Sequence, residues 1–86
     1  MGLREVPKEL DKLVDALRST EGLTAKGKTL TTFYIGSRPF LHFHDDADGL
    51  RADVKWDGRH FAREPVETHA QRVDLIKRVH AHLADR

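Results

Sequence analysis

The sequence contains no cysteine, and this absence removes several chemistries at once. Disulfide bonds, thiolate metal sites and cysteine nucleophiles are all excluded. The chain also lacks an apolar run long enough to span a bilayer, and its first residues lack the hydrophobic stretch of a signal peptide. We therefore expect a cytoplasmic domain with no membrane partner.

The sequence also lacks a large excess of either positive or negative charge. Fifteen basic residues stand against 14 acidic ones, which leaves a net charge of +1. A nucleic-acid-binding domain normally carries a basic stripe. Nucleic acid is therefore not the expected partner, and such binding would have to use the scattered cations Lys26, Lys28, Arg38 and Arg59. A chain of 86 residues suffices for one modest core, so we expect a single domain over residues 1–86.

Helical periodicity marks both ends of the chain. Pro7 suits a first helical position, and apolar residues then recur at helical spacing as Leu10, Leu13, Val14 and Leu17. This pattern predicts a helix from about Pro7 to Ser19. The run Thr68-His69-Ala70-Gln71 fits a capping box, so a second helix should start near Thr68. Its apolar stripe would consist of Val73, Ile76, Val79 and Leu83.

Between the helices the period changes to two. Residues 24–28 are predicted to form a polar connector, and four runs rich in β-branched and aromatic residues follow, at 30–36, 40–45, 50–56 and 59–64. The turns between them are short, and Asp57-Gly58 is typical of a two-residue hairpin. Short turns force neighbouring strands to be antiparallel. The predicted fold is α+β with the order α-β-β-β-β-α, a four-stranded antiparallel meander with both helices packed on one face.

The predicted turn lengths also set the strand register. A three-residue turn at 37–39 would pair Phe33 with Phe43, and a four-residue turn at 46–49 would pair Phe43 with Ala52. The Asp-Gly turn would pair Val54 with Phe61. These residues then share one apolar face, as a half-buried sheet requires. The predicted core face consists of Phe33, Ile35, Leu41, Phe43, Val54 and Phe61.

The opposite face of the predicted sheet carries polar and aromatic side chains. Tyr34, His42 and Asp53 would form one cross-strand row. A carboxylate beside an imidazole would orient the ring and raise its pKa. The predicted binding face consists of Thr32, Tyr34, Phe40, His42, His44, Arg51 and Asp53.

Several functions fit this face. An ordinary solvated surface is the commonest outcome for a polar sheet face. The functional interpretation that we favour is a non-catalytic module that binds a second copy of itself or another protein, because aromatic residues such as tyrosine, and also arginine, are enriched at interfaces. This interpretation needs no cofactor.

A metal site is the main alternative. His42 and His44 lie two residues apart on a predicted strand, so both imidazoles should point the same way. Asp53 or Asp45 could supply a third ligand to zinc or another divalent transition metal, with water in the fourth position. An acid–base site of His42, Asp53 and Tyr34 is a further alternative. It lacks an identifiable nucleophile and an enclosing layer, so an enzyme is not expected.

One stretch resembles a known family. The residues Phe40, His42 and His44, followed by Ala52-Asp53-Val54, are similar to the small bacterial luciferase-like domain family over about residues 33–56. The chain departs from that family downstream, where Trp56-Asp57-Gly58 leads straight into another predicted strand. The resemblance implies no catalytic residue that can be placed here. It draws attention to the same two histidines and Asp53.

Overall fold

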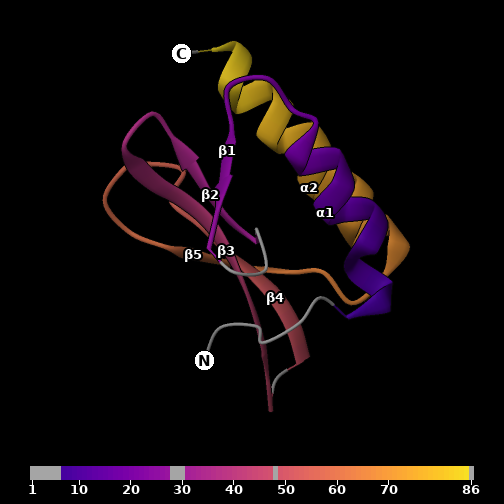
Figure 1. Ribbon diagram of the computed structural model, residues 1–86. Coiled ribbons are helices and arrows are strands. Elements are labelled where there is room, and N and C mark those ends of the chain that lie inside the picture. Colours follow the sequence, from indigo (N-terminus) through magenta and orange to yellow (C-terminus); the bar gives the residue numbers. More distant parts are fainter. Residues whose placement is uncertain (1–6, 28–30, 48, 86) are drawn as a thin grey trace.

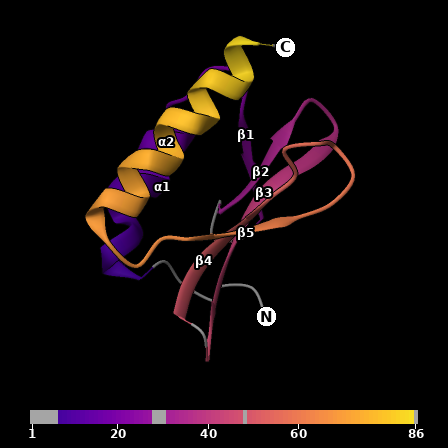
Figure 2. The same cartoon turned by 180° about the vertical axis from the view of Figure 1, so that it is seen from behind.

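The computed structural model describes residues 7–27, 31–47 and 49–85. It has two layers, an antiparallel sheet and a pair of helices that lies against one face of that sheet (Figure 1). The view from behind shows both helices on the same side of the strands (Figure 2). The predicted α+β class, and the packing of both helices on one face, are therefore confirmed.

The first helical segment begins as a 3-10 turn and continues as an α-helix. The turn η1 spans Lys8–Leu10 and α1 spans Asp11–Arg18. Pro7 precedes the turn, where its missing N–H removes no helical hydrogen bond. Leu13, Val14 and Leu17 are buried, as their spacing predicted.

The second helix, α2, spans His69–Ala84. Its N-terminus has the predicted capping box: the Thr68 hydroxyl accepts from the Gln71 backbone N–H at 3.1 Å, and the Gln71 side chain accepts from the Thr68 N–H at 3.0 Å. Leu75 and Val79 are buried, with Ile76 and Leu83 packed partly against the core. No helix in residues 7–27, 31–47 and 49–85 combines the length and apolar character needed to cross a membrane.

The described residues form five strands rather than the four that we predicted. They are β1 (Thr24–Lys26), β2 (Thr32–Ile35), β3 (Arg38–Asp46), β4 (Gly49–Val54) and β5 (Ala62–Pro65). Their order in the sheet follows the chain and all pairs are antiparallel, so the meander is confirmed. The additional strand is β1, predicted as a connector. It has three residues and pairs with β2, so its own sequence holds too few positions to show a period of two.

The register of β2 against β3 also differs from the prediction. Phe33 pairs with Leu41 rather than with Phe43, because the turn consists of two residues, Gly36 and Ser37, instead of three, and one extra residue in β3 then shifts the pairing by one. Gly36 adopts a φ of 61°, which the tight turn requires and glycine allows. The predicted start of this strand, Leu30, lies outside the described residues, as do Lys28 and Asp48.

A register irregularity between Phe33 and Tyr34 relocates Phe40. The pairing passes from Tyr34–Pro39 to Phe33–Leu41, which leaves Phe40 as the extra residue of a β-bulge. Phe40 was predicted on the outer face, but it is 3% exposed and belongs to the core beside Leu41. A bulge lets two consecutive side chains face the same side, and this accounts for the wrong prediction.

The register of β3 against β4 is confirmed, whereas that of β4 against β5 is wrong by one residue. Val54 pairs with Ala62 rather than with Phe61. The Asp57 carboxylate accepts the backbone N–H groups of Arg59 and His60, both at 2.8 Å, and this forms a longer loop than the predicted hairpin. A slip of one residue moves every side chain to the other face. Phe61 is accordingly 40% exposed, not part of the core.

One cluster of buried apolar side chains fills the space between the layers. Phe33 and Phe43 meet edge to face, with ring centroids 6.4 Å apart. The cluster joins the helices to the inner face of the sheet and consists of Leu10, Leu13, Val14, Leu17, Phe33, Phe40, Leu41, Phe43, Leu50, Ala52, Val54, Val66, Leu75 and Val79. It leaves the outer face of β3 and β4 on the side away from both helices (Figures 1 and 2).

Candidate functional site

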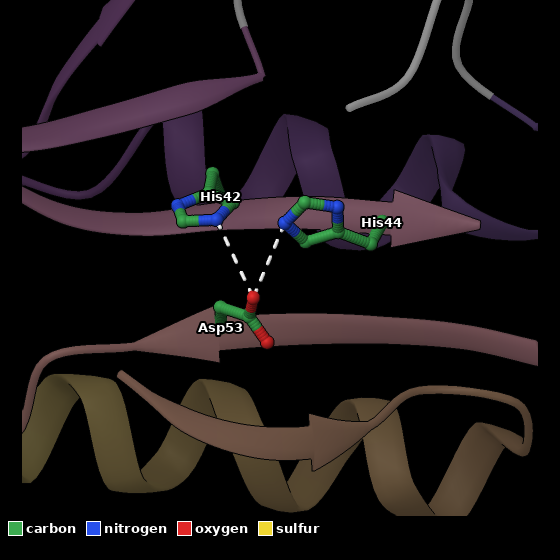
Figure 3. Close-up of side chains that lie close together, drawn as sticks. All are labelled: His42, His44 and Asp53. Carbon is green, nitrogen blue, oxygen red and sulfur yellow. Dashed lines mark ion pairs between the residues drawn. The ribbon is translucent and has the colours of Figure 1, made fainter. Parts of the chain in front are cut away.

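Three side chains predicted to lie together meet on the outer face of the sheet (Figure 3). His42 and His44 come from β3, where alternation directs both to the same side. Asp53 comes from β4 and sits directly opposite His42. His44 pairs with Arg51, so it reaches Asp53 along the diagonal. The antiparallel register thus converts two sequence positions on one strand and one on the next into a three-residue group.

The Asp53 carboxylate is the centre of this group. Its Oδ2 lies 3.1 Å from Nε2 of His44 and 3.4 Å from Nε2 of His42. Its Oδ1 accepts from Nε of Arg51 at 3.1 Å. The side chain of Asp53 is 13% exposed, against 15% for His44 and 27% for His42. One partly buried carboxylate is therefore shared by two imidazoles and a guanidinium.

The ring of His42 has two aromatic neighbours. Its centroid lies 4.6 Å from that of His44 and also 4.6 Å from that of Phe61, both in edge-to-face contacts. Phe61 was predicted in the core, and only the one-residue slip of β5 brings it here. No local sequence signal distinguishes the two placements, because a two-residue and a longer loop both begin with Asp57-Gly58.

Burial lowers the pKa of His42, and the charge of His44 lowers it further. Asp53 acts in the opposite direction, and Arg51 adds to the lowering. We had expected the neighbouring carboxylate to raise this pKa. The effect of the carboxylate is outweighed, because the imidazole is removed from water and lies beside two other basic groups, His44 and Arg51. The neutral ring, which has a free nitrogen lone pair, is thereby favoured.

The spacing of the three groups suits a metal ion. One ligand atom from each of His42, His44 and Asp53 can be chosen so that all lie within 4.8 Å of one another. Ligands bonded at zinc distances in a tetrahedral site lie about 3.3 Å apart. The two nitrogen–oxygen separations, 3.1 and 3.4 Å, are close to that value. Asp45, the other predicted third ligand, is not a member of this group.

Arg51 is placed to orient one ligand of such a metal site without binding the metal itself. By holding Oδ1 of Asp53, it fixes the plane of the carboxylate and leaves Oδ2 directed between the two imidazoles. Groups that orient a metal ligand in this way commonly matter for affinity. The same arrangement also makes chemical sense without an ion, because three donors share one acceptor.

Of the other members of the predicted binding face, Thr32 stays next to the three-residue group, whereas Tyr34 and Phe40 lie elsewhere. Thr32 lies on β2 directly opposite His42. Tyr34 pairs with Pro39, and its ring contacts the Lys26 ammonium at 4.5 Å to the centroid. The predicted Tyr34-His42-Asp53 row is therefore not formed, which removes the phenol from the acid–base alternative. Phe40, as described above, belongs to the core.

Comparisons of the chain with family models, curated proteins and solved structures gave no match. The similarity of residues 33–56 to the luciferase-like domain family accordingly stays a prediction.

Proposed function

We propose that this protein binds one divalent transition metal ion, preferentially zinc, through Nε2 of His42, Nε2 of His44 and Oδ2 of Asp53. The observation that carries the proposal is the convergence of both imidazole nitrogens on a single carboxylate oxygen, at 3.4 and 3.1 Å. Two nitrogen donors and one oxygen donor form a ligand set that zinc accepts readily.

The site is partly open, which leaves room for a further ligand. His42 keeps 27% of its side-chain surface exposed, and both helices lie on the other face of the sheet (Figure 2). Water can then complete a four-coordinate ion. A binding function, with an exchangeable ligand on the solvent side, follows from three protein ligands and one open position.

Metal titration of protein purified without a histidine tag tests the proposal. Calorimetry with Zn²⁺ should give one ion per chain, and Co²⁺ should produce a visible absorption band that Zn²⁺ abolishes. His42→Ala and His44→Ala should each weaken Zn²⁺ binding by at least about tenfold, because each removes one of three protein ligands. His69→Ala is the matched control, since this exposed histidine begins α2, away from the site.

Two results would contradict the proposal. One is the absence of stoichiometric uptake of Zn²⁺, Co²⁺ and Ni²⁺ by the wild-type chain. The other is uptake that His42→Ala and His44→Ala leave unchanged, which would assign the ion to different ligands.

A second candidate is self-association through the outer face of the sheet. Phe61 favours it, because this side chain is a large hydrophobic residue with 40% of its surface exposed, beside His42. Sedimentation equilibrium should then show a dimer that Phe61→Ser dissociates. A monomer at all concentrations would exclude this candidate and leave the metal proposal unaffected.

A further inference from the structure

A second candidate site is a pocket whose lining includes none of His42, His44 and Asp53. It is a pocket of about 400 Å³. Its walls come from the β2–β3 turn region, the loop after β4 and the C-terminal part of α2, and the residues that matter here are Arg38, Phe40, Lys55, Trp56, Asp57 and His82. Pockets of this size accommodate small organic ligands.

Three aromatic rings from three different elements form one wall. His82 of α2 stacks on Phe40 of β3, with centroids 5.2 Å apart and planes at 17°. Trp56 meets both rings edge to face, at 5.7 Å from Phe40 and 5.6 Å from His82. Rings that already support one another can receive a flat ligand with little ordering cost.

Trp56 is held in place by contacts with Glu64 and Arg78. Its indole N–H donates to Oε2 of Glu64 at 2.9 Å, and Oε1 of Glu64 accepts from Nη2 of Arg78 at 2.8 Å. The Arg78 guanidinium also lies over the indole, 5.5 Å from the ring centroid. These contacts fix the indole, so the aromatic wall is preorganised.

The polar groups available at the pocket are donors. Arg38 is exposed, and its guanidinium makes no hydrogen bond or ion pair within the described part of the chain. The carboxylate of Asp57 is engaged instead, because it accepts from the backbone N–H groups of Arg59 and His60 and contacts the His60 ring at 3.3 Å. The Lys55 ammonium lies over the Phe61 ring at 4.7 Å. A ligand that enters therefore meets a free cation and an acid that is already paired.

We propose that this pocket binds a small planar aromatic carboxylate. The ligand's ring would lie against Phe40, Trp56 and His82, and its carboxylate would pair with the Arg38 guanidinium, which presents a fork of donors suited to that group. This proposal is independent of the metal site, because the two share no residue.

Trp56 is the single tryptophan of the chain, so its fluorescence reports directly on the pocket. Benzoate, benzamide and benzamidinium have the same ring and nearly the same shape, but they carry a negative, a neutral and a positive group. When the full chain is titrated, the Trp56 emission at a given probe concentration should change most with benzoate, less with benzamide and least with benzamidinium. Amide NMR shifts around Phe40 and His82 should follow the same order.

The variant Arg38→Gln separates charge recognition from simple stacking. It should weaken benzoate binding by about fivefold, as expected for one exposed ion pair, and leave benzamide binding unchanged. Arg59→Gln is the control, since Arg59 is a nearby exposed cation that does not line the pocket. Equal affinities for the three probes, or loss of benzoate binding in Arg59→Gln but not in Arg38→Gln, would overturn the proposal. So would the absence of any change in Trp56 emission and in the Phe40 and His82 shifts.

Discussion

The imidazole of His82 lies nearly parallel to the phenyl ring of Phe40, with centroids 5.2 Å apart and planes at 17°. This contact attaches the last turns of α2 to the bulged end of β3. A histidine near a helix C-terminus usually interacts with the helix dipole. Here the stack on Phe40, supported by Trp56, gives the ring a packing role as well.

Replacement of His82 by alanine should lower the free energy of unfolding by about 1 kcal/mol, the contribution of a stacked aromatic pair. His82→Phe should retain most of the stability, because it keeps a flat ring in the same place. Urea denaturation followed by circular dichroism measures both. His69→Ala serves as the control for loss of a helical histidine. Equal losses in the alanine and phenylalanine variants would show that the stack does not stabilise the fold.

Removal of the Asp53 carboxylate, which three side chains share on the outer face, should also lower the free energy of unfolding. In metal-free protein, Asp53→Ala deprives His42, His44 and Arg51 of the carboxylate that they share. We expect a loss of about 1–3 kcal/mol in unfolding free energy, since the group is mostly buried. Chemical denaturation in the presence of a chelator measures it.

Asp74→Ala is the matched control for this variant. Asp74 also accepts from an arginine, at 2.8 Å from Nε of Arg78, but its side chain is 63% exposed. Its loss should cost well under about 1 kcal/mol, as is usual for surface pairs. Similar losses in the two variants would mean that burial of Asp53 contributes nothing.

The histidine group could be predicted because it depends on a single strand pair. His42, His44 and Asp53 require only the register of β3 against β4, which is the predicted one, although Asp46 pairs with Gly49 and the turn is therefore shorter than the four residues expected. The alternation of apolar residues on both strands then left one register that buries the apolar set. The prediction needed no information about distant parts of the chain.

The rest of the outer face depended on interactions that are not local. The slip of β5 follows from the hydrogen bonds of the Asp57 carboxylate, which lengthen the loop and move Phe61 to the outer face. The bulge at Phe40 is stabilised by a stack on His82, far along the chain. Neither the sign of a one-residue slip nor the position of a bulge can be read from hydrophobic periodicity, because both leave the local pattern almost unchanged.

The Asp57 loop should make stability depend on pH in the acid range. Hydrogen bonds from the backbone of His60 and Arg59 lower the pKa of Asp57 from 3.8 to about 2. Because the folded pKa lies below the unfolded one, the stabilisation is fully present above pH 3.8 and is lost as the pH falls through about 2. Carboxyl carbon NMR should give the lowered pKa directly. Asp57→Asn should reduce the dependence of unfolding free energy on pH between those values, and an Asp57 pKa near 3.8 would contradict the expectation.

Gly49 at the start of β4 should not tolerate a side chain, for two separate reasons. Its φ is 101°, which L residues rarely adopt, and a Cβ there would overlap the Glu67 carboxylate. That carboxylate accepts from the Leu50 backbone N–H, so displacing it also costs a hydrogen bond.

Gly49→Ala should therefore lower the unfolding free energy by about 2–4 kcal/mol, the sum of backbone strain and the lost bond. Gly58→Ala isolates the strain, because Gly58 has a φ of 76° and nothing within 4 Å of its added Cβ. The Gly58 variant should lose about 1–2 kcal/mol. In a double-mutant cycle with Glu67→Ala, the Gly49→Ala loss should fall towards the Gly58 value, because no carboxylate remains to be displaced. An undiminished loss would assign the whole effect to the backbone and none to Glu67.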